Sequence, residues 1–161
     1  MRRERGFTLI EMLIVVAILG IVAGIGVPRV LGMVAGYQLE TARSIAVQQL
    51  RNARLEAIGR NRSVEWVLLA NGRGVTRIVG GADLTRSSDI TVSNGIGFTL
   101  SGFAAPSDAV RFSQRGNIVN IGAGQTGQLT ISRTGSAETR EVGFVAGTGL
   151  IQSGIGRWRV R

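Results

Sequence analysis

The chain has 161 residues, a formal net charge of +9, and neither histidine nor cysteine. The lack of cysteine excludes disulfides, thiolate metal sites and thiol catalysis, and the lack of histidine removes the commonest general base and transition-metal ligand. All 19 basic residues are arginine, and the 10 carboxylates are scattered. We therefore expect no enzyme, cofactor or metal site. The positive charge indicates either a solvated surface or a partner such as nucleic acid or acidic lipid.

The first predicted element is an apolar helix at residues 7–27. As a helix this stretch is about 31 Å long, which matches the hydrocarbon core of a bilayer. Three arginines at positions 2, 3 and 5 precede it, so the positive-inside rule places that end in the cytoplasm and the remainder outside the inner membrane. Pro28 follows directly and is expected either to kink the helix or to loosen its hydrogen bonds.

Glu11 lies near the start of this apolar run. A carboxylate at the centre of a membrane helix costs roughly 2.5–3.5 kcal/mol on insertion scales. Three explanations are open for it. The residue is tolerated near a wet helix end, or it belongs to an ordinary secretory signal, or a partner neutralises it on assembly.

Helical spacing resumes at residues 37–61 and predicts an amphipathic continuation of the same helix, on the order of fifty residues in all. Glu56 and Arg60 are spaced for an i,i+4 pair, and Gly59 and Asn61 indicate the helix end. The expected core stripe is Leu39, Ala42, Ala46, Leu50, Ala53 and Ala57.

Beyond Asn61 the apolar period changes to two, which predicts short strands separated by glycine-containing turns. The predicted strands are 63–70, 74–79, 89–92, 97–100, 109–113, 117–121, 128–132 and 140–145. The fold class is therefore α+β: a long N-terminal helix, transmembrane in its first half and amphipathic in its second, packed against a mostly antiparallel β-rich C-terminal domain. Gly122, Gly124 and Gly127 spell GxGxxG, but a strand pattern follows where a dinucleotide site needs a helix, so we expect a hairpin loop there.

The stretch RGFTLIEMLIVVAIL resembles the N-terminus of type IV prepilins, because Gly6, Phe7, Glu11 and Pro28 all fall at the spacing of that family. The resemblance implies that a prepilin peptidase cleaves between Gly6 and Phe7 and methylates the Phe7 amine. It also implies that Glu11 attracts the N-terminal amine of a neighbouring subunit in a helical filament. At about 4 Å and an effective dielectric of 20, that attraction is roughly 4 kcal/mol, which offsets the burial cost.

A second resemblance lies at LRNARLEAIGRNRSVEWVL, which is similar to the helix-to-first-strand signature of the GspH/FimT pseudopilins. The matching positions are Ala53, Arg54, Glu56, Ala57, Ile58, Arg60, Asn61 and Val64. The stretch FSQRGNI, at 112–118, also resembles a strand and turn of that family. We expect the helical part of this signature to serve packing.

The chain ends in GIGRWRVR, where Arg157, Arg159 and Arg161 alternate with Trp158 and Val160. As a strand, this segment places three guanidinium groups on one face. One interpretation is a terminal strand that docks Trp158 into the core. The other is a phosphate-binding tail with an aromatic ring for stacking, since some FimT-like minor pilins bind DNA through a C-terminal Gly-Arg-x-Arg motif.

These observations predict a leader peptide at 1–6, a transmembrane and assembly helix at 7–28, its amphipathic continuation at 29–60, and a periplasmic β-rich domain at 61–161. The predicted function is that of a minor pilin or pseudopilin, a structural subunit of a type II secretion pseudopilus or a type IV pilus. The alternative is a DNA-binding minor pilin acting in DNA uptake. The partners implied by the resemblance are other pilin subunits, a prepilin peptidase, an inner-membrane assembly platform, membrane lipid and, for the alternative, DNA.

Overall fold

The computed structural model describes residues 7–69, 73–81, 84, 88–89, 95–105, 107–122 and 125–154. The chain divides into two compact units, one ending at Tyr37 and the other beginning at Gln38. The helix and eight strands appear in the order α1 (Leu9–Arg60), β1 (Val64–Leu68), β2 (Arg73–Ile78), β3 (Ser88–Asp89), β4 (Ile96–Ser101), β5 (Ala109–Phe112), β6 (Thr126–Arg133), β7 (Thr139–Val145) and β8 (Ile151–Gly154). A long helix followed by short strands confirms the predicted α+β class.

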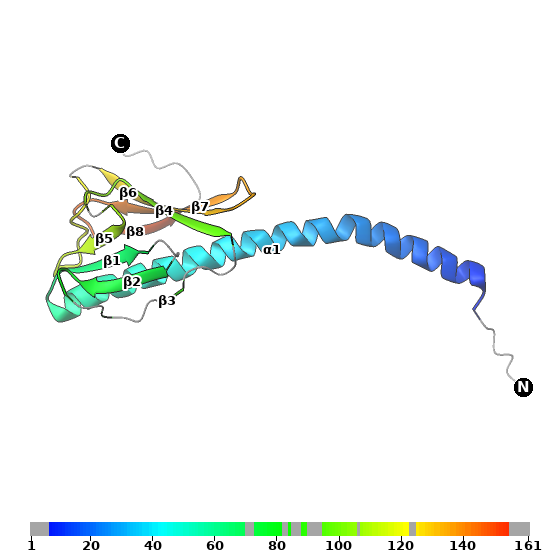
Figure 1. The fold of residues 1–161 in the computed structure, drawn as a ribbon, viewed down its shortest axis with the longest axis horizontal. Helices are drawn as coiled ribbons and strands as arrows, with labels where there is room; N and C mark the ends of the chain where they lie inside the picture. Colours follow the sequence, from blue (N-terminus) through cyan, green and yellow to red (C-terminus); the bar gives the residue numbers. More distant parts are fainter. Residues whose placement is uncertain are drawn as a thin grey trace, which may run out of the picture. The chain divides into compact units, whose positions relative to one another are not determined.

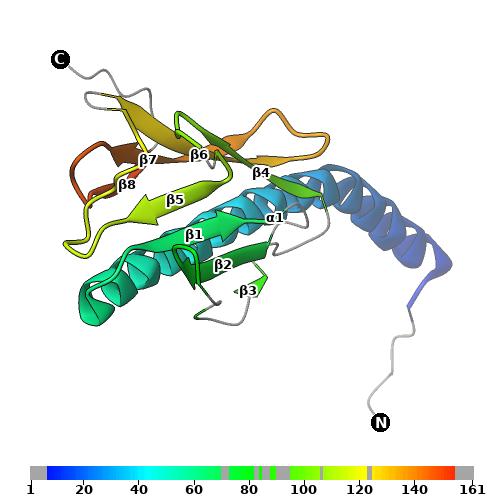
Figure 2. The ribbon, with the colours of Figure 1, turned by 60° about the vertical axis from the view of Figure 1, so that its left-hand side comes forward.

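The second unit contains the C-terminal part of α1 and two four-stranded sheets, with strand orders β3-β2-β1-β5 and β4-β6-β7-β8. Their strand pairs are antiparallel. Both sheets lie along the C-terminal part of α1 (Figures 1 and 2). The helix therefore forms the spine of the domain core.

The core forms where the apolar stripe of α1 meets the inner faces of both sheets. The six stripe residues predicted from helical spacing, Leu39, Ala42, Ala46, Leu50, Ala53 and Ala57, are fully buried. Trp66 on β1 and Phe144 on β7 are the largest partners from the two sheets, and both are also fully buried. Because most stripe residues are alanines, the strands approach the helix closely and the larger side chains come from the sheets.

The C-terminus of α1 has the hydrogen bonds of a Schellman motif. Asn61 has a left-handed backbone with φ of 50°, its N–H donates to the carbonyl of Ile58, and the N–H of Arg62 donates to the carbonyl of Ala57. Asparagine is among the few residues other than glycine that adopt this conformation readily. The predicted helix end is confirmed, and the geometry assigns the terminating role to Asn61.

The strand predicted at 117–121 is wrong, because this segment makes only an isolated bridge between Ile118 and Phe112. Beside β5 the side chain of Asn120 takes the place of a backbone partner. Its Oδ1 accepts from the Arg111 N–H at 2.9 Å, and its Nδ2 donates to the Ala109 carbonyl at 2.7 Å. Val119 N–H still donates to the Arg111 carbonyl at 3.0 Å, so the Asn120 amide replaces only part of the ladder that the alternating pattern suggested.

Two further strands differ from the prediction. β8 was not predicted as a strand, although Ile151 pairs with Phe144 and Gly154 with Glu141. The strand predicted at 89–92 is represented by β3, and residues 90–92 lie outside the described residues. The GxGxxG segment leads into β6 rather than into a helix, as the strand pattern after it predicted.

Candidate functional site

The first unit is a helical segment that exposes apolar side chains all round. Within the described residues, α1 is the one helix long and apolar enough to cross a membrane. Its exposed large side chains run from Leu9, 81% exposed, to Val34, 44% exposed. The helix continues through Pro28 without a break. A segment of this kind needs lipid or other helices around it, as the predicted anchor requires.

Glu11 lies in the first turn of α1, next to the residue that caps the helix. The backbone N–H of Glu11 donates to Thr8 Oγ1 at 3.3 Å, so Thr8 is the N-cap and Glu11 occupies the third helical position. Thr-x-x-Glu is the spacing of a capping box, and a carboxylate there also interacts favourably with the helix dipole. The hydrogen bond to Thr8 uses only the backbone of residue 11, so the local advantage of a glutamate there is its interaction with the helix dipole, which sequence reasoning had missed.

The signature residues at the end of α1 pack or pair locally. Ala57 is buried, Val64 is buried at the start of β1, and Arg60 Nε lies 2.6 Å from Glu56 Oε2. Arg54 lies against two glycines of the second unit. A Cβ added to Gly116 would lie 2.9 Å from Arg54 Nε, and one added to Gly149 would clash with the same guanidinium.

Arg54 of the helix signature contacts Gly116 of the FSQRGNI turn. Gly116 has φ of 76°, a left-handed backbone that favours glycine, and Ile58 packs against the same glycine. Arg54 Nε is buried there and has no hydrogen-bond partner among the described residues. The expected packing role of the helical signature is therefore consistent with the geometry, and Gly149 joins the site from a segment with no sequence signature.

A buried carboxylate joins three strands of the first sheet. Glu65 on β1 is 4% exposed, and the register places it opposite both Arg77 and Arg111. Arg77 Nε donates to its Oε1 at 2.6 Å, and an Arg111 Nη donates to its Oε2 at 3.0 Å. Burial acts to raise the pKa of Glu65, but the hydrogen bonds and charges of the two arginines outweigh it and hold that pKa below its ordinary value.

Because the pKa of Glu65 is lower in the folded than in the unfolded protein, ionised Glu65 stabilises the domain above the unfolded pKa of about 4.3. That contribution is lost as the pH falls through the lower folded pKa. We expect Glu65→Gln to reduce stability most at neutral pH, and the difference from the parent to shrink below about pH 4. Urea unfolding midpoints measured at neutral pH and at several acidic pH values test this. A difference that is constant over that range would contradict the assignment.

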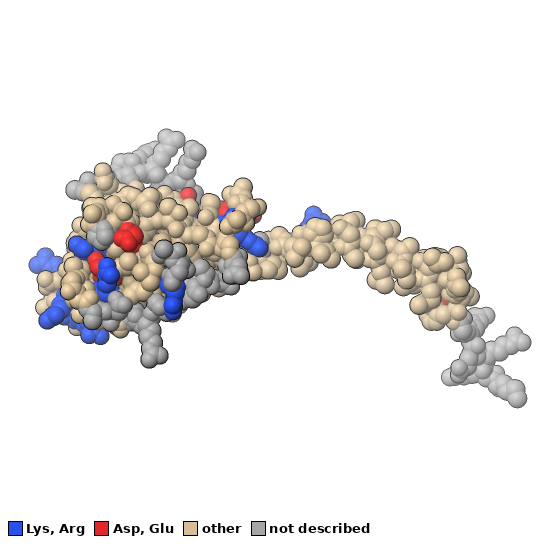
Figure 3. All heavy atoms as spheres, viewed as in Figure 1, with Lys and Arg blue, Asp and Glu red and all other residues tan. Residues whose placement is uncertain are grey.

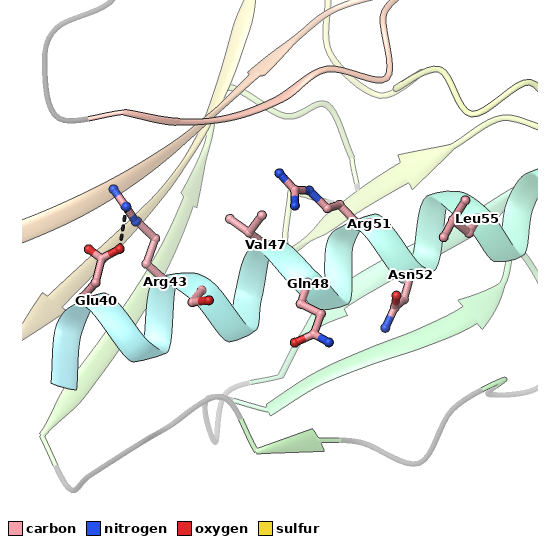
Figure 4. A pocket seen from close by; sticks show the side chains of 8 residues that line it. Glu40, Arg43, Val47, Gln48, Arg51, Asn52 and Leu55 are labelled. Atoms are coloured by element: carbon pink, nitrogen blue, oxygen red, sulfur yellow. Dashed lines mark hydrogen bonds and ion pairs between the residues drawn. The ribbon is translucent and has the colours of Figure 1, made fainter. Parts of the chain in front are cut away.

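A groove of about 540 Å³ runs along the exposed side of α1 in the second unit. Its lining residues are Glu40, Arg43, Ser44, Val47, Gln48, Arg51, Asn52 and Leu55. Arg43, Val47 and Arg51 point to one side of the helix (Figure 4). Glu40 is paired with Arg43 at 2.5 Å and with Arg140 at 3.7 Å, so its charge is compensated.

The remaining predicted site residues lie outside the described residues: Gly6, Arg157, Trp158, Arg159 and Arg161. The last pair of β8 that the structure describes joins Gly154 to Glu141. Both interpretations of the tail therefore stay predictions. In the described part of the chain, no three acidic side chains gather as metal ligands.

A long N-terminal helix, apolar and exposed at first and packed against antiparallel sheets later, defines a pilin-like protein. Comparison with known families agrees. The model of the prokaryotic N-terminal methylation motif matches residues 1–27, and that of type II transport protein GspH matches residues 38–148. The chain belongs to the type II transport protein GspH family. Its family and fold are those of structural pilins, which are not enzymes, and they imply assembly with other pilin subunits in a filament.

One curated relative is the pilin-like protein PilA1 of Thermus thermophilus, which is 41% identical over 74 residues. The match covers 44% of this chain and 44% of the relative, so the chain spans less than half of that protein. Among solved structures, the type IV minor pilin FimU of Pseudomonas aeruginosa is similar in two crystal forms. The TM-scores are 0.61 and 0.56, at 16% and 17% identity, over 76% and 73% of this chain and 92% and 93% of FimU. This likeness confirms the fold.

Proposed function

We propose that the protein is a minor pilin, a membrane-anchored structural subunit that is incorporated into a type IV filament. The observation that carries this proposal is the first unit: a helix with apolar side chains exposed from Leu9 to Val34 and a single carboxylate, Glu11, in its first turn. In a bilayer that carboxylate is costly, and in a filament the N-terminal amine of a neighbour neutralises it. Membrane storage and filament assembly therefore make opposite demands on one residue.

The proposed topology follows from the positive charge that precedes the helix. Arg2, Arg3 and Arg5 keep the N-terminus in the cytoplasm, the segment at 7–28 spans the inner membrane, and the continuation at 29–60 enters the domain at 61–161 outside it. Residues 1–6 are the leader peptide. A prepilin peptidase removes it and methylates Phe7, and an assembly platform in the inner membrane extracts the processed subunit from the lipid.

For the system in which the subunit works, we propose a type IV pilus rather than a secretion pseudopilus. The pilin-like protein of Thermus and the minor pilin FimU support a pilus. The family description points to type II transport, so the pseudopilus is the competing assignment. The identity of the subunits that co-purify with the protein distinguishes the type IV pilus from the secretion pseudopilus.

Processing gives the direct test. We expect mass spectrometry of the membrane fraction to find a chain that begins at methylated Phe7. Replacing Gly6 by alanine should slow cleavage, and a larger residue should abolish it, because the peptidase needs a residue without a side chain at this position. Gly59→Ala, the same change past the membrane segment, is the matched control and should leave cleavage unaffected. An uncut Met1 terminus in a host with an active prepilin peptidase would refute the assignment.

DNA binding during uptake is the second candidate function. It rests on Arg157, Trp158, Arg159 and Arg161, which alternate basic and aromatic side chains in the sequence. Three arginines on one face suit a phosphate backbone, and the tryptophan suits base stacking. This function stays a prediction.

A further inference from the structure

We infer that the end of the domain where α1 terminates is a docking surface for an acidic region of a neighbouring filament subunit. This inference rests on the proposed function, because it names a contact within the proposed filament. The docking surface surrounds Arg54, and we call it the helix-end surface. Its residues are Arg51, Leu55, Ile58, Arg62, Arg115 and Leu150.

The arginines of this surface have no counter-ion among the residues that the structure describes. Glu56, the acidic residue of the last helical turns, is already paired with Arg60. Within the described part of the chain, Arg51, Arg54, Arg62 and Arg115 form no side-chain hydrogen bond or ion pair. Figure 3 shows basic side chains gathered at this end of the domain. Four uncompensated guanidinium groups favour a partner that brings carboxylates.

Contacts across the fold bring these residues together from three separate segments. Arg54 and Ile58 both touch the backbone at Gly116, which follows Arg115 in the turn after β5. Gly149 lies against both Arg54 and the carbonyl of Gly116, and Leu150 follows it. Arg62 is fixed two residues beyond the end of α1 by the hydrogen bond of its backbone N–H to the Ala57 carbonyl. The surface is therefore built on hydrogen-bonded and packed backbone, which reduces the entropy lost on docking.

Apolar side chains lie among the arginines, and they favour a protein over a polyanion as the partner. Leu55 is 64% exposed, Leu150 47% and Ile58 45%. A phosphate backbone offers no apolar surface to cover such side chains, whereas protein interfaces combine an apolar centre with arginine. None of the aromatic side chains that the structure describes belongs to this surface, so it offers no platform for stacking bases. The groove on α1 extends the same surface, because Arg51 and Leu55 line both.

The sequence itself supplies a sharp test, because the chain contains no lysine. The variants Arg51→Lys, Arg62→Lys and Arg115→Lys each introduce the single side-chain amine and keep the charge. In membranes or sheared filaments of the native host, a carbodiimide joins that amine to a carboxylate in direct contact. An amide bond forms, and the activated carboxylate releases a urea. The matched control is Arg133→Lys, at the last residue of β6. The hairpin between β6 and β7 lies away from the C-terminal end of α1 in both views (Figures 1 and 2).

We expect Arg51→Lys and Arg115→Lys to give at least a tenfold greater yield of covalent adduct than Arg133→Lys or the parent chain. Mass spectrometry should place the new bond on Asp or Glu of another pilin subunit. The double variant Arg51→Glu, Arg115→Glu should lower the amount in filaments at least fivefold while its level in the membrane and its melting temperature stay unchanged.

Three results would overturn the inference. The first is an adduct yield equal to that of the control, and the second is an adduct to a protein outside the filament. The third is a charge reversal that abolishes binding of the detergent-solubilised full chain to duplex DNA but leaves filament incorporation intact; this would make the surface a nucleic-acid site. A parent chain that is absent from filaments is a different outcome, because it refutes the proposed function itself.

Discussion

Trp66→Ala should lower the free energy of unfolding of the domain by about 3–5 kcal/mol. The side chain is fully buried between α1 and the first sheet, and its Nε1 donates to Gln49 Oε1 at 3.0 Å. Its ring also fills the space above Gly74, where an added Cβ would lie 2.6 Å from Nε1. Truncation therefore leaves a large cavity and removes the hydrogen bond to Gln49.

The measurement is urea unfolding of a fragment covering residues 38–161, followed by circular dichroism, since this fragment contains every residue of the core. Trp66→Phe keeps most of the volume and loses the hydrogen bond to Gln49, so it should cost about 1 kcal/mol. Leu55→Ala removes a side chain that is 64% exposed and should change stability by less than about 0.5 kcal/mol. A loss below about 1 kcal/mol for Trp66→Ala would contradict the described core.

The helix was predictable because its signals are local. Helical spacing marked the six stripe residues that the structure buries, and the i,i+4 spacing marked the pair of Glu56 with Arg60. The end of the helix was likewise marked by Asn61, whose left-handed backbone closes it. Each of these features depends on residues at most a few turns apart, so periodicity and capping rules apply directly.

The features that sequence reasoning missed depend on register between distant segments. Glu65 looked like an ordinary polar position of an alternating strand, and only the pairing of β1 with β2 and β5 places Arg77 and Arg111 beside it. The packing of Arg54 requires Gly116 and Gly149 to meet at the helix. Both glycines are far from Arg54 in the sequence, so no local spacing indicates the contact. β8 was missed for a related reason, because a short segment ending in glycine has little strand propensity and is held by its pairing with β7.

Glu11→Val should lower incorporation into filaments at least tenfold while leaving the amount of membrane-inserted protein equal to or above that of the parent. Insertion does not suffer, because the substitution removes a carboxylate that costs roughly 2.5–3.5 kcal/mol in a bilayer. Assembly does suffer, because a neighbour's N-terminal amine loses an attraction of roughly 4 kcal/mol at about 4 Å. Immunoblots of sheared filaments against the membrane fraction measure both quantities in one culture.

Two further variants separate this assembly role from the local contact at the first turn of α1. Thr8→Val removes the hydroxyl that accepts from the Glu11 N–H but keeps the carboxylate, so it should assemble nearly as the parent does. Glu11→Gln keeps a side chain of the same size without the charge and should fail as Glu11→Val does. If Thr8→Val is defective and Glu11→Gln is not, capping of the helix explains the glutamate. If Thr8→Val assembles and Glu11→Gln does not, the charge itself serves assembly, because the carboxylate is unfavourable in lipid and favourable beside a neighbour's amine.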